Sequence, residues 1–462
     1  MKLLPLWSAA RVGVLGVFAY MLVPPMVHGQ TFQQSTALAV TRTVEDKLRD
    51  VVNVRDYGAK CDGATDDSAA FQAAEVATPY GLINIPSGPC YINANINITK
   101  DNIKFRGSGQ GSTYIQMGPN VTKLFNITNN TFNQVVLPEF SDFTVDGSRS
   151  PNGIAFYING ARSVHIDRVY TVRCYISYFV DKSPQVTSTF HLSHFLIEDT
   201  PDLAGARGIV INGGGDDWFI SDGRLFENNQ GKWNVGLELR SGGGFMIDRV
   251  DISLFGRGFL VDPPAGSFVR FGQINALQCD TSWGDNATLD GTAAQASGYP
   301  NGIYNLHFVN SWFSSAGTNG GNGNGMNLVS ARGIVIDTSQ FHSNSLNGIR
   351  IQPGAADVII SHGQFSSNSN GYGNAGANTG IYSGIAVDAN TAGFTLDANR
   401  SGAVGYSPNN QKYGISVSAG CSRYSVLGND LNNNATGPYN DLSRSPESQV
   451  GMNLPSAVNL SH

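Results

Sequence analysis

One short unit recurs along most of the chain and constrains the fold more than any other feature of the sequence. Each copy reads glycine, an apolar residue, any residue and a second apolar residue, followed by a turn and a further short apolar strand. The spacing of the copies is uneven, because Gly236 and Gly258 are 22 residues apart and Gly348 and Gly384 are 36 apart. Uneven spacing is typical of a solenoid whose coils carry loops of different length, whereas a propeller keeps a more constant period. Clear copies begin at Gly208, Gly236, Gly258, Gly325, Gly348, Gly384 and Gly414.

Stacked copies of this unit predict a column of outward side chains. Alternate side chains of a strand point to opposite faces, so the two apolar positions face the core and the residues between and after them face outward. The middle of the column holds two acids and two arginines: Glu238, Asp262, Arg240 and Arg350. Its expected members are Ala155 and Tyr157, Val210 and Asn212, Glu238 and Arg240, Leu260 and Asp262, Asn327 and Val329, Arg350 and Gln352, Ala386 and Asp388, and Ser416 and Ser418.

A second distinctive stretch precedes the repeats. Residues Val52–Tyr57 alternate and predict a short strand, the Ala-rich run Ser68–Ala77 predicts a helix with one buried stripe, and Leu82–Ile92 predicts further strand. The acidic pair Asp66 and Asp67 directly precedes the helix, where carboxylates accept hydrogen bonds from free backbone amides. We therefore interpret this pair as a helix cap and not as a catalytic dyad.

This stretch resembles the N-terminal signature of the pectate-lyase-like superfamily, which includes rhamnogalacturonases, epimerase-like proteins and phage tailspikes. The resemblance implies an all-β, single-stranded right-handed parallel β-helix whose N-terminal end is capped by the helix. It implies no particular reaction. The matching segments are Asn53–Ala59, Asp62–Asp67, Phe71–Ala74 and Ile85–Gly88.

The catalytic patterns of that superfamily do not carry over to this chain. Polygalacturonases have Asn-Thr-Asp-Gly, Asp-Asp and Gly-His-Gly on successive coils. Here Asp216–Asp217 falls in the turn after a strand, and Ser361–Gly363 falls on the second strand of its unit. The Asp-Pro-His-Asp arrangement of mannuronan epimerases is not found either. The candidate site must therefore be argued from the residues themselves.

The N-terminus and the composition indicate an exported protein. Residues 1–29 combine Lys2 and Arg11 with the apolar stretch Val12–Val23, which is shorter than the ~20 residues that span a bilayer, and we expect cleavage near Gly29. An uncut membrane anchor is the alternative. With 55 glycines among 462 residues, 14% charged residues and a net charge of -6, the chain is turn-rich and mildly acidic, which argues against nucleic acid as a partner. We expect a secreted or periplasmic location, with the cell surface as a further possibility and no stable membrane insertion after cleavage.

The predicted domain plan follows from these segments. After the signal peptide 1–29 comes a polar segment, 30–50, whose charged run Arg42–Arg49 predicts a short exposed helix. A single β-helix domain is expected over 51–436, because a solenoid extends one core by adding coils. The polar, proline-containing segment 437–462 is expected to be a tail.

Five cysteines are present, so they cannot all pair within one chain. Cys61 lies in the turn before the predicted helix and Cys90 in the strand after it, and an oxidising compartment would favour a disulfide between them. We interpret Cys174, Cys279 and Cys421 as buried apolar residues. No cysteine and histidine spacing fits a zinc site, and we expect neither a metal nor another cofactor.

The longest connections tend to precede the repeat strands, so their loops should stack along one edge and form the wall of a groove. Grooves of this kind suit polymers, and tryptophan or tyrosine at the edge can stack on sugar rings. The insertion that carries Trp283, Asp285 and Asp290 has an ambiguous register. For any single aromatic residue, packing of its loop onto the helix is an equal alternative. The expected substrate-binding residues are Tyr157, Asn212, Arg207, Arg257, Trp233, Trp283, Trp312 and Tyr372.

Two ways of cutting a polysaccharide are compatible with this surface. Hydrolysis needs two carboxylates about 5 Å or roughly 6.5–9.5 Å apart, and strand spacing places the Cβ atoms of Glu238 and Asp262 at ~8 Å. A lyase instead needs a base and cations that stabilise an enolate, which Arg240 and Arg350 would supply. The expected catalytic residues are thus Glu238, Asp262, Arg240 and Arg350. The competing interpretation is a ladder of exposed ion pairs, each worth roughly 0–1 kcal/mol.

Two functional hypotheses remain. In the first, the chain is an exported enzyme, a hydrolase or a lyase, that acts on an extracellular and acidic polysaccharide. In the second, it is a glycan-binding surface protein or a tailspike-like attachment module without catalysis. We expect a monomer, with a homotrimer as the alternative. The signal segment favours the first hypothesis, because virion proteins assemble in the cytoplasm.

Overall fold

The computed structural model describes residues 30–454 apart from 37, 79, 129–134, 183–186, 214, 297–301, 371–379 and 403–409. The described chain divides into two units with their boundary between Asp50 and Val51. The expected signal peptide, the final residues 455–462 and the predicted binding residue Tyr372 lie outside the described residues. Among the helices of the described part, none is both long and apolar enough to cross a membrane.

The first unit is small and polar. Strands β1 (Thr31–Phe32) and β2 (Arg42–Thr43) pair antiparallel, and helix α1 (Val44–Leu48) follows directly. Thr43 caps α1 by accepting a hydrogen bond from the backbone N–H of Asp46, and the helix has no buried residue. The short exposed helix expected in this charged run is therefore present.

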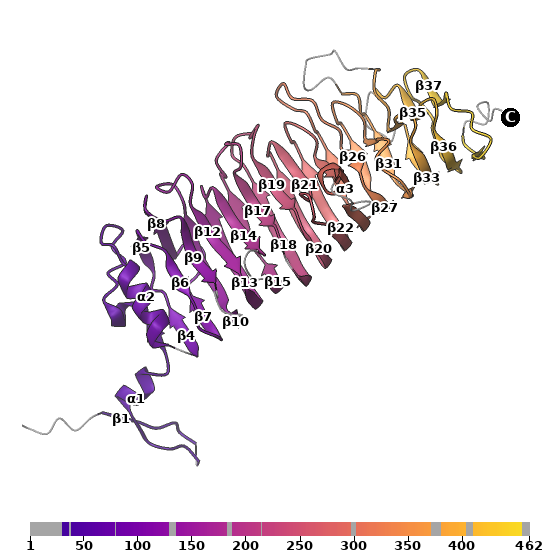
Figure 1. The fold of residues 1–462 in the computed structure, drawn as a ribbon. Coiled ribbons are helices and arrows are strands. Elements are labelled where there is room, and N and C mark those ends of the chain that lie inside the picture. Colours follow the sequence, from indigo (N-terminus) through magenta and orange to yellow (C-terminus); the bar gives the residue numbers. More distant parts are fainter. Residues whose placement is uncertain are drawn as a thin grey trace, which may run out of the picture. The chain divides into compact units, whose positions relative to one another are not determined.

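The second unit is a solenoid of parallel strands, drawn as a stack of similar coils in Figure 1. One sheet, which we call the groove sheet, receives one strand from each of 13 coils in the described part. The single-stranded right-handed parallel β-helix expected from the sequence is confirmed. The strands of the groove sheet are β6 (Ile96–Ile98), β9 (Lys123–Thr128), β12 (Ile154–Asn159), β14 (Ile176–Asp181), β17 (Arg207–Ile211), β19 (Val235–Leu239), β21 (Arg257–Val261), β23 (Ala287–Asp290), β26 (Met326–Ser330), β29 (Ile349–Ile351), β32 (Ile385–Val387), β35 (Tyr413–Val417) and β37 (Gly437–Asp441).

The remaining strands form a second sheet, which we call the bent sheet, and their pairings are also parallel. Its strands are β3 (Val52–Asn53), β4 (Gly81–Asn84), β5 (Gly88–Ile92), β7 (Ile103–Arg106), β8 (Thr113–Met117), β10 (Val135–Val136), β11 (Glu139–Asp146), β13 (Ala161–Val172), β15 (Ser188–Ser193), β16 (Leu196–Glu198), β18 (Asp216–Phe226), β20 (Gly242–Ser253), β22 (Val269–Asp280), β24 (Ile303–Val309), β25 (Trp312–Ser314), β27 (Arg332–Asp337), β28 (Gln340–His342), β30 (Val358–Ser361), β31 (Gln364–Ser366), β33 (Ala392–Asp397), β34 (Arg400–Ser401), β36 (Ser422–Leu427) and β38 (Gln449–Gly451).

The glycine that opens each repeat unit is required by the next coil. A Cβ atom on Gly208 would lie 2.5 Å from the backbone oxygen of Gly236, and one on Gly348 would lie 2.6 Å from that of Gly384. Carbon and oxygen atoms do not approach so closely, so a side chain there would force neighbouring coils apart. The close contact between the backbones of neighbouring coils therefore explains why the repeat unit begins with glycine.

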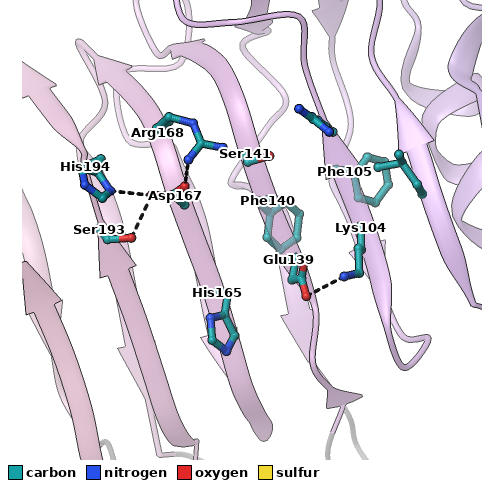
Figure 2. A pocket seen from close by; sticks show the side chains of 12 residues that line it. Lys104, Phe105, Glu139, Phe140, Ser141, His165, Asp167, Arg168, Ser193 and His194 are labelled. Carbon is teal, nitrogen blue, oxygen red and sulfur yellow. Dashed lines mark hydrogen bonds and ion pairs between the residues drawn. The ribbon is translucent and has the colours of Figure 1, made fainter.

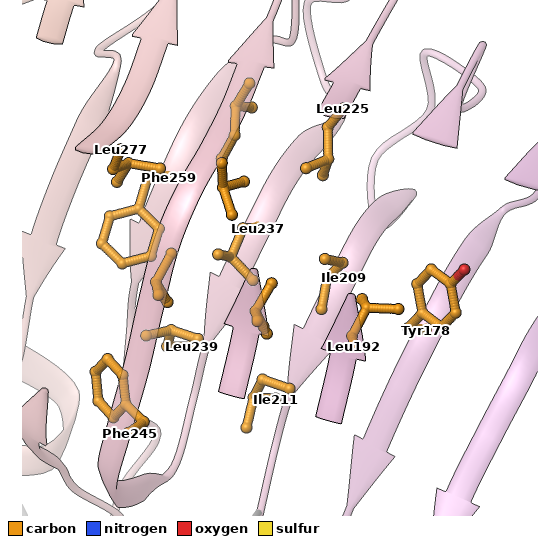
Figure 3. Close-up of a cluster of buried hydrophobic side chains, with 14 of the residues drawn as sticks. Tyr178, Leu192, Ile209, Ile211, Leu225, Leu237, Leu239, Phe245, Phe259 and Leu277 are labelled. Carbon is orange, nitrogen blue, oxygen red and sulfur yellow. The ribbon is translucent and has the colours of Figure 1, made fainter. Parts of the chain in front are cut away.

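The core runs along the axis inside the coils. Leu237 stacks between Ile209 and Phe259, and Leu239 stacks between Ile211 and Val261, because their strands pair in register (Figure 3). These side chains are fully buried. Burial of a leucine or phenylalanine stabilises the fold by about 1.5–3 kcal/mol relative to leaving it exposed, so each added coil extends the same core.

The bent sheet turns at one residue per coil, which we call the corner row. Its members have left-handed backbone conformations with φ between 49° and 65°. Such φ values are uncommon for residues other than glycine, and short polar side chains tolerate them best. The corner row contains Asp142, Arg168, His194, Asp222, Arg249, Ala276, Asn310, Thr338, His362, Ala398, Gly428 and Met452.

Helix α2 (Ser68–Ala77) lies at the N-terminal end of the solenoid, after the 3-10 helix η1 (Val54–Tyr57) (Figure 1). Phe71 of α2 is fully buried, and its ring stacks on Phe105 of β7 with 6.5 Å between the centroids. Asp66 accepts a hydrogen bond from the backbone N–H of Ser68 at the start of α2. Asp67 instead accepts hydrogen bonds from the backbone of the preceding turn, so only the first acid of the pair caps the helix.

The disulfide expected between Cys61 and Cys90 is present and joins the turn before α2 to β5. Cys174, Cys279 and Cys421 are free and buried, as expected. The proposed boundary of the tail needs a correction, because β37 pairs with β35 and β38 pairs with β36. Residues 437–454 thus add strands to both sheets, since Tyr439 fills the inward position that Ile415 fills one coil earlier.

Candidate functional site

The outward column predicted from the repeats is a row of the groove sheet. Strand pairing aligns Val210, Glu238 and Leu260, and then continues to Asn327 and Arg350. Within the span of the predicted column, two coils that lack the opening glycine were missed, and they insert Phe179 and Thr288 into the row. At the first coil the predicted register was wrong by two residues: Tyr157, and not Ala155, aligns through Phe179 with Val210. The row therefore contains Tyr157, Phe179, Val210, Glu238, Leu260, Thr288, Asn327, Arg350, Ala386 and Ser416.

Glu238 stands at the centre of this row and is held by two arginines. Its Oε1 accepts a hydrogen bond from Nε of Arg240 at 2.8 Å, and its Oε2 accepts one from NH2 of Arg240 at 3.0 Å and another from Nε of Arg207. The residue is only 3% exposed. Burial alone would raise its pKa, but the hydrogen bonds and charges of the two arginines outweigh burial and hold the pKa below its usual value. Glu238 is therefore ionised, and both of its oxygens are occupied.

Asp262 lies in the neighbouring outward row, on the coil after Arg240, and is half-buried. Its pKa is raised, first by burial and then by the negative charges of Asp290 and Glu238. Asp290 is the corresponding residue of the next coil, because Val261 pairs with Leu289. Neighbouring parallel strands lie ~4.8 Å apart, so Asp262 and Asp290 form a pair of adjacent carboxylates. A like charge at such a distance disfavours ionisation of Asp262, which agrees with the raised direction of its pKa.

Asp285, on the same insertion as Asp290, organises the edge of the groove. Its Oδ1 accepts hydrogen bonds from the backbone N–H and the side chain of Asn324 at 2.7 and 2.9 Å, and its Oδ2 accepts one from Asn327 at 3.0 Å. These bonds tie the loop 314–324 to the sheet. The expected stacking of loops along one edge is confirmed here, because the backbone N–H of Trp283 also donates to Phe255 of the preceding coil.

Two arginines line the outward row on the other side of Glu238. Arg207 pairs with Val235, and Val235 pairs with Arg257, so the two guanidinium groups lie two coils apart. Arg207 is committed to Glu238. Nε of Arg257 is buried and finds no hydrogen-bond partner among the described residues. Arg257 is therefore a cation of this cluster whose guanidinium group the described residues do not fully satisfy.

Aromatic side chains occur at the same edge. Nζ of Lys232 lies 5.1 Å from the ring centroid of Trp233 and 4.7 Å from that of Trp283, so the ammonium group joins the two indoles. Trp233 is 58% exposed. Trp312 does not belong to this group: it lies on β25 of the bent sheet, where its ring nitrogen donates to Nε2 of His342 at 2.5 Å.

The N-terminal members of the predicted binding set point at one acid. Tyr157 donates to Oδ2 of Asp181 at 2.8 Å, and the side chain of Asn212 donates to Oδ1 at 2.9 Å. Asp181 occupies the outward row that continues to Asn212, Arg240 and Asp262. Tyr157 is 8% exposed, so its role is mainly to support Asp181.

Arg350 lies apart from the other residues expected to be catalytic. It is four coils from Glu238, about 19 Å at the usual strand spacing, and it pairs with Asp388 at 2.8 Å. Both line a cavity of about 640 Å³ together with Tyr382, Tyr413 and Ser416. The structure thus brings together Glu238, Arg240 and Asp262, and places Arg350 in a separate part of the same groove.

Asp181 and Asp290 are the acids that sequence analysis did not assign to the site. Their coils carry the apolar, any, apolar pattern as Tyr178–Val180 and Ala287–Leu289, but Ser177 and Asn286 stand where the other copies have glycine. A search for the pattern without its glycine would have found both coils. It would also have resolved the register of the insertion.

Comparisons with known proteins agree with the fold. Residues 51–236 match the family model described as Rhamnogalacturonase A/epimerase, pectate lyase-like. The A-module of mannuronan C-5 epimerase AlgE6 from Azotobacter vinelandii is 17% identical with a TM-score of 0.54, covering 87% of this chain and 98% of its own. The tailspike of E. coli bacteriophage HK620 is 12% identical with a TM-score of 0.63, covering 93% and 83% respectively. Tailspike protein 3 of bacteriophage CBA120 is 14% identical with a TM-score of 0.59, covering 92% and 65%. No curated protein sequence matches the chain.

The fold and these similarities define the chain as a right-handed parallel β-helix protein. More specifically, residues 51–236 are similar to the rhamnogalacturonase A/epimerase type of pectate-lyase-like sequence. At identities below 20%, the solved structures share the fold alone.

Proposed function

We propose that this chain is an exported enzyme that cleaves an acidic polysaccharide bound along the groove sheet. The observation that carries the proposal is the pair Asp262 and Asp290, in which burial and a neighbouring charge raise the pKa of Asp262. Glycoside hydrolysis requires two neighbouring carboxyl groups, and a raised pKa suits one of them to act as the acid. Export rests on the N-terminal segment of the sequence.

In this mechanism Asp262 donates its proton to the glycosidic oxygen as the bond to the sugar breaks. Asp290 is the second carboxyl group, and it either attacks the anomeric carbon or activates a water molecule that does so. Glu238, expected from the sequence to be catalytic, has a different role here. Because both of its oxygens are bound, it positions the guanidinium groups of Arg207 and Arg240.

The preference for an acidic glycan rests on the arginines. Arg240 lies in the row of Asp262 one coil earlier, and Arg257 has a free buried donor. A guanidinium group binds carboxylates through two parallel hydrogen bonds. The cavity at Arg350 and Tyr382 is about four coils away, so we propose it as a distal subsite of the same polymer.

A lyase reaction is the second candidate, and the free donor of Arg257 is the observation that favours it. A cation bound to a uronate carboxylate stabilises the enolate that forms when a base removes the neighbouring proton. In that case Asp290 would be the base. A protein that binds glycan without cleaving it, or a tailspike-like module, is the alternative outcome of the test below.

The test incubates the mature chain, residues 30–462, with acidic and neutral polysaccharides while ultraviolet absorbance and reducing ends are followed. Reducing ends without absorbance identify a hydrolase, and new absorbance from unsaturated uronates identifies a lyase. Asp262→Asn should lower the rate by about 10²–10⁴-fold, which is the usual contribution of a general acid. Asp357→Asn is the control, because Asp357 is an exposed aspartate that pairs with Arg332 beside β30 of the bent sheet, outside the groove.

Equal losses in both variants would contradict the assignment of Asp262. A wild-type rate in Asp262→Asn would contradict the mechanism. Binding of polysaccharide without any product would move the function to the adhesive alternative.

A further inference from the structure

The bent sheet carries a second cavity, of about 640 Å³, near its N-terminal end. Its lining side chains come from β4, β7, β11, β13 and β15 and from His194 directly after β15, and Figure 2 labels most of them. Lys104, Glu139 and His165 share one outward row, because their strands pair in register. The corner residues Arg168 and His194 line it as well. This cavity lies on a different sheet from the groove and shares no residue with it.

The charges in this cavity balance only while the histidines are neutral. Nζ of Lys104 lies 2.8 Å from Glu139. The carboxylate of Asp142 pairs with two arginines: it lies 2.7 Å from Nε of Arg168 and 3.4 Å from Nε of Arg106. Asp167 contacts the same Arg168. Three cations therefore face three acids, and every histidine that gains a proton adds a positive charge without a new partner.

His165 presents one face of its ring to the cavity. Its other face stacks on His191 with 4.6 Å between centroids and 5° between planes, and His191 stacks in turn on Phe219 at 4.8 Å. Since His191 belongs to the following coil, the free face turns toward Glu139 on the preceding coil. Burial and the proximity of His165 hold the pKa of His191 below its usual value.

His194 contributes the second titratable ring. Its Nδ1 lies 2.9 Å from Oδ1 of Asp167, which also accepts a hydrogen bond from Oγ of Ser193 at 2.8 Å. On the following coil it faces Asp222, whose carboxylate is paired with Arg249 at 2.6 Å. The ring of His194 therefore lies beside acids that are already shared with arginines.

The arrangement of Asp167, Ser193 and His194 is not a nucleophilic triad. Serine and histidine both bind the same carboxylate oxygen, so the histidine is not placed to take the serine proton. The same geometry recurs further along, where Asp337 accepts from Ser361 and His362, each at 2.9 Å. Because the same arrangement occurs at the corner of another coil, we assign it a structural role in stabilising the bend. The first copy differs from the second in having a cavity beside it.

We propose that this cavity is a second saccharide site, which binds an anionic sugar unit and binds it more tightly in mildly acidic solution. The sugar carboxylate would contact Lys104, Arg106 and Arg168, and an apolar C–H face of the sugar would lie on the free face of His165. The inference goes beyond the proposed function and uses neither Asp262 nor Asp290.

The binding test uses the full mature chain carrying Asp262→Asn, so that substrate is not cleaved, and tri-galacturonic acid as the probe. Calorimetry at pH 5.5 and 7.5 covers the range in which an imidazole of ordinary pKa goes from roughly 90% to roughly 10% protonated. We expect at least a fivefold tighter dissociation constant at pH 5.5. The double variant His165→Asn, His194→Asn should reduce this ratio to about one, whereas His362→Asn, at the equivalent corner away from the cavity, should leave it unchanged.

Site-specific evidence comes from the ring C–H signals of histidine in NMR spectra. The two cavity histidines are assigned through their asparagine variants, and both should shift when the trisaccharide is added. Inorganic sulfate supplies charge without a C–H face, so it should bind more weakly than the trisaccharide. Equal binding of a neutral galactose trisaccharide, a pH-independent constant, unshifted cavity histidines, or the same loss in His362→Asn would each overturn the proposal. Because these measurements need no turnover, they remain decisive even if the proposed cleavage is refuted.

Discussion

The groove sheet and the bent sheet both carry acids paired with arginines, but the two sets differ in burial and in recurrence. On the groove sheet Glu238 is 3% exposed, pairs with two arginines and has no equivalent on the other coils as far as their residues are described. On the bent sheet, pairs such as Asp142 with Arg168 recur as Asp222 with Arg249, with exposed arginines. A contact that recurs from coil to coil serves stacking, whereas a buried cluster that occurs once needs a different explanation. The comparison therefore favours a functional role for the groove cluster.

Glu238→Gln should have the largest effect on stability. Removing one partner of a buried ion pair costs about 3–5 kcal/mol, because the arginines remain buried without their counter-charge. The pKa of Glu238 is lowered in the fold, so its contribution is present above the unfolded value and is lost as pH falls through the folded pKa. Urea denaturation at pH 7 and pH 4 should show a difference between wild type and variant that shrinks at the lower pH. An unchanged midpoint at pH 7 would show that the cluster is no more than a surface ladder.

Glu227 offers a test of how burial of a carboxyl group affects stability at different pH values. This glutamate lies at the end of β18, is 3% exposed and accepts a hydrogen bond from the backbone N–H of Thr200 at 3.0 Å. Burial raises its pKa to about 9. The contribution of Glu227 to the free energy of unfolding is fully present below the pKa that this residue has in the unfolded chain. It is lost as pH rises toward about 9.

Glu227→Gln should therefore be more stable than wild type at pH 8 and similar at pH 4. Thermal melting at the two values measures the difference, with Glu447→Gln as an exposed control. Parallel loss of stability above neutral pH in both the variant and the wild type would show that Glu227 is not the group responsible.

As for Glu227, the ionisation of Asp262 should lower the stability of the fold as pH rises. The loss should be smaller than for Glu227, because Asp262 is only half-buried. Its pKa is raised by burial and by the charges of Asp290 and Glu238, so ionisation works against folding as pH rises. Asp262→Asn should lose activity while its melting temperature at pH 8 equals or exceeds that of wild type. A clear decrease in melting temperature would indicate that Asp262 is a structural residue.

The smallest effect is expected at an isolated pair of the bent sheet. Arg332 and Asp357 lie on adjacent coils, 2.5 Å apart, with side chains 55% and 53% exposed. Exposed pairs of this kind are screened by solvent and contribute about 0–1 kcal/mol. Arg332→Gln should shift the urea midpoint only slightly, and the shift should vanish in high salt. A loss comparable to that of Glu238→Gln would remove the distinction between the two sheets.

Much of the groove could be predicted from the sequence, because its pattern is local. Alternation along each strand put Val210, Glu238 and Arg350 on one outward face, and the structure aligns them. The prediction failed where a local signal was missing or ambiguous. Asn286 replaces the glycine of its coil, so Asp290 was not aligned with Asp262, and Trp312 was assigned to the groove although it lies on the bent sheet.

The sequence by itself determined the solenoid, the row of outward side chains and the pairing of Cys61 with Cys90, because each follows from spacing along a short stretch of chain. Only the tertiary structure decided which acid has a lowered pKa and which has a raised one. Glu238 and Asp262 look alike in the sequence, but Arg207 reaches the first from another coil and Asp290 approaches the second from the next. A pKa depends on the charges and the burial around a group, and those come from coils far apart in the chain.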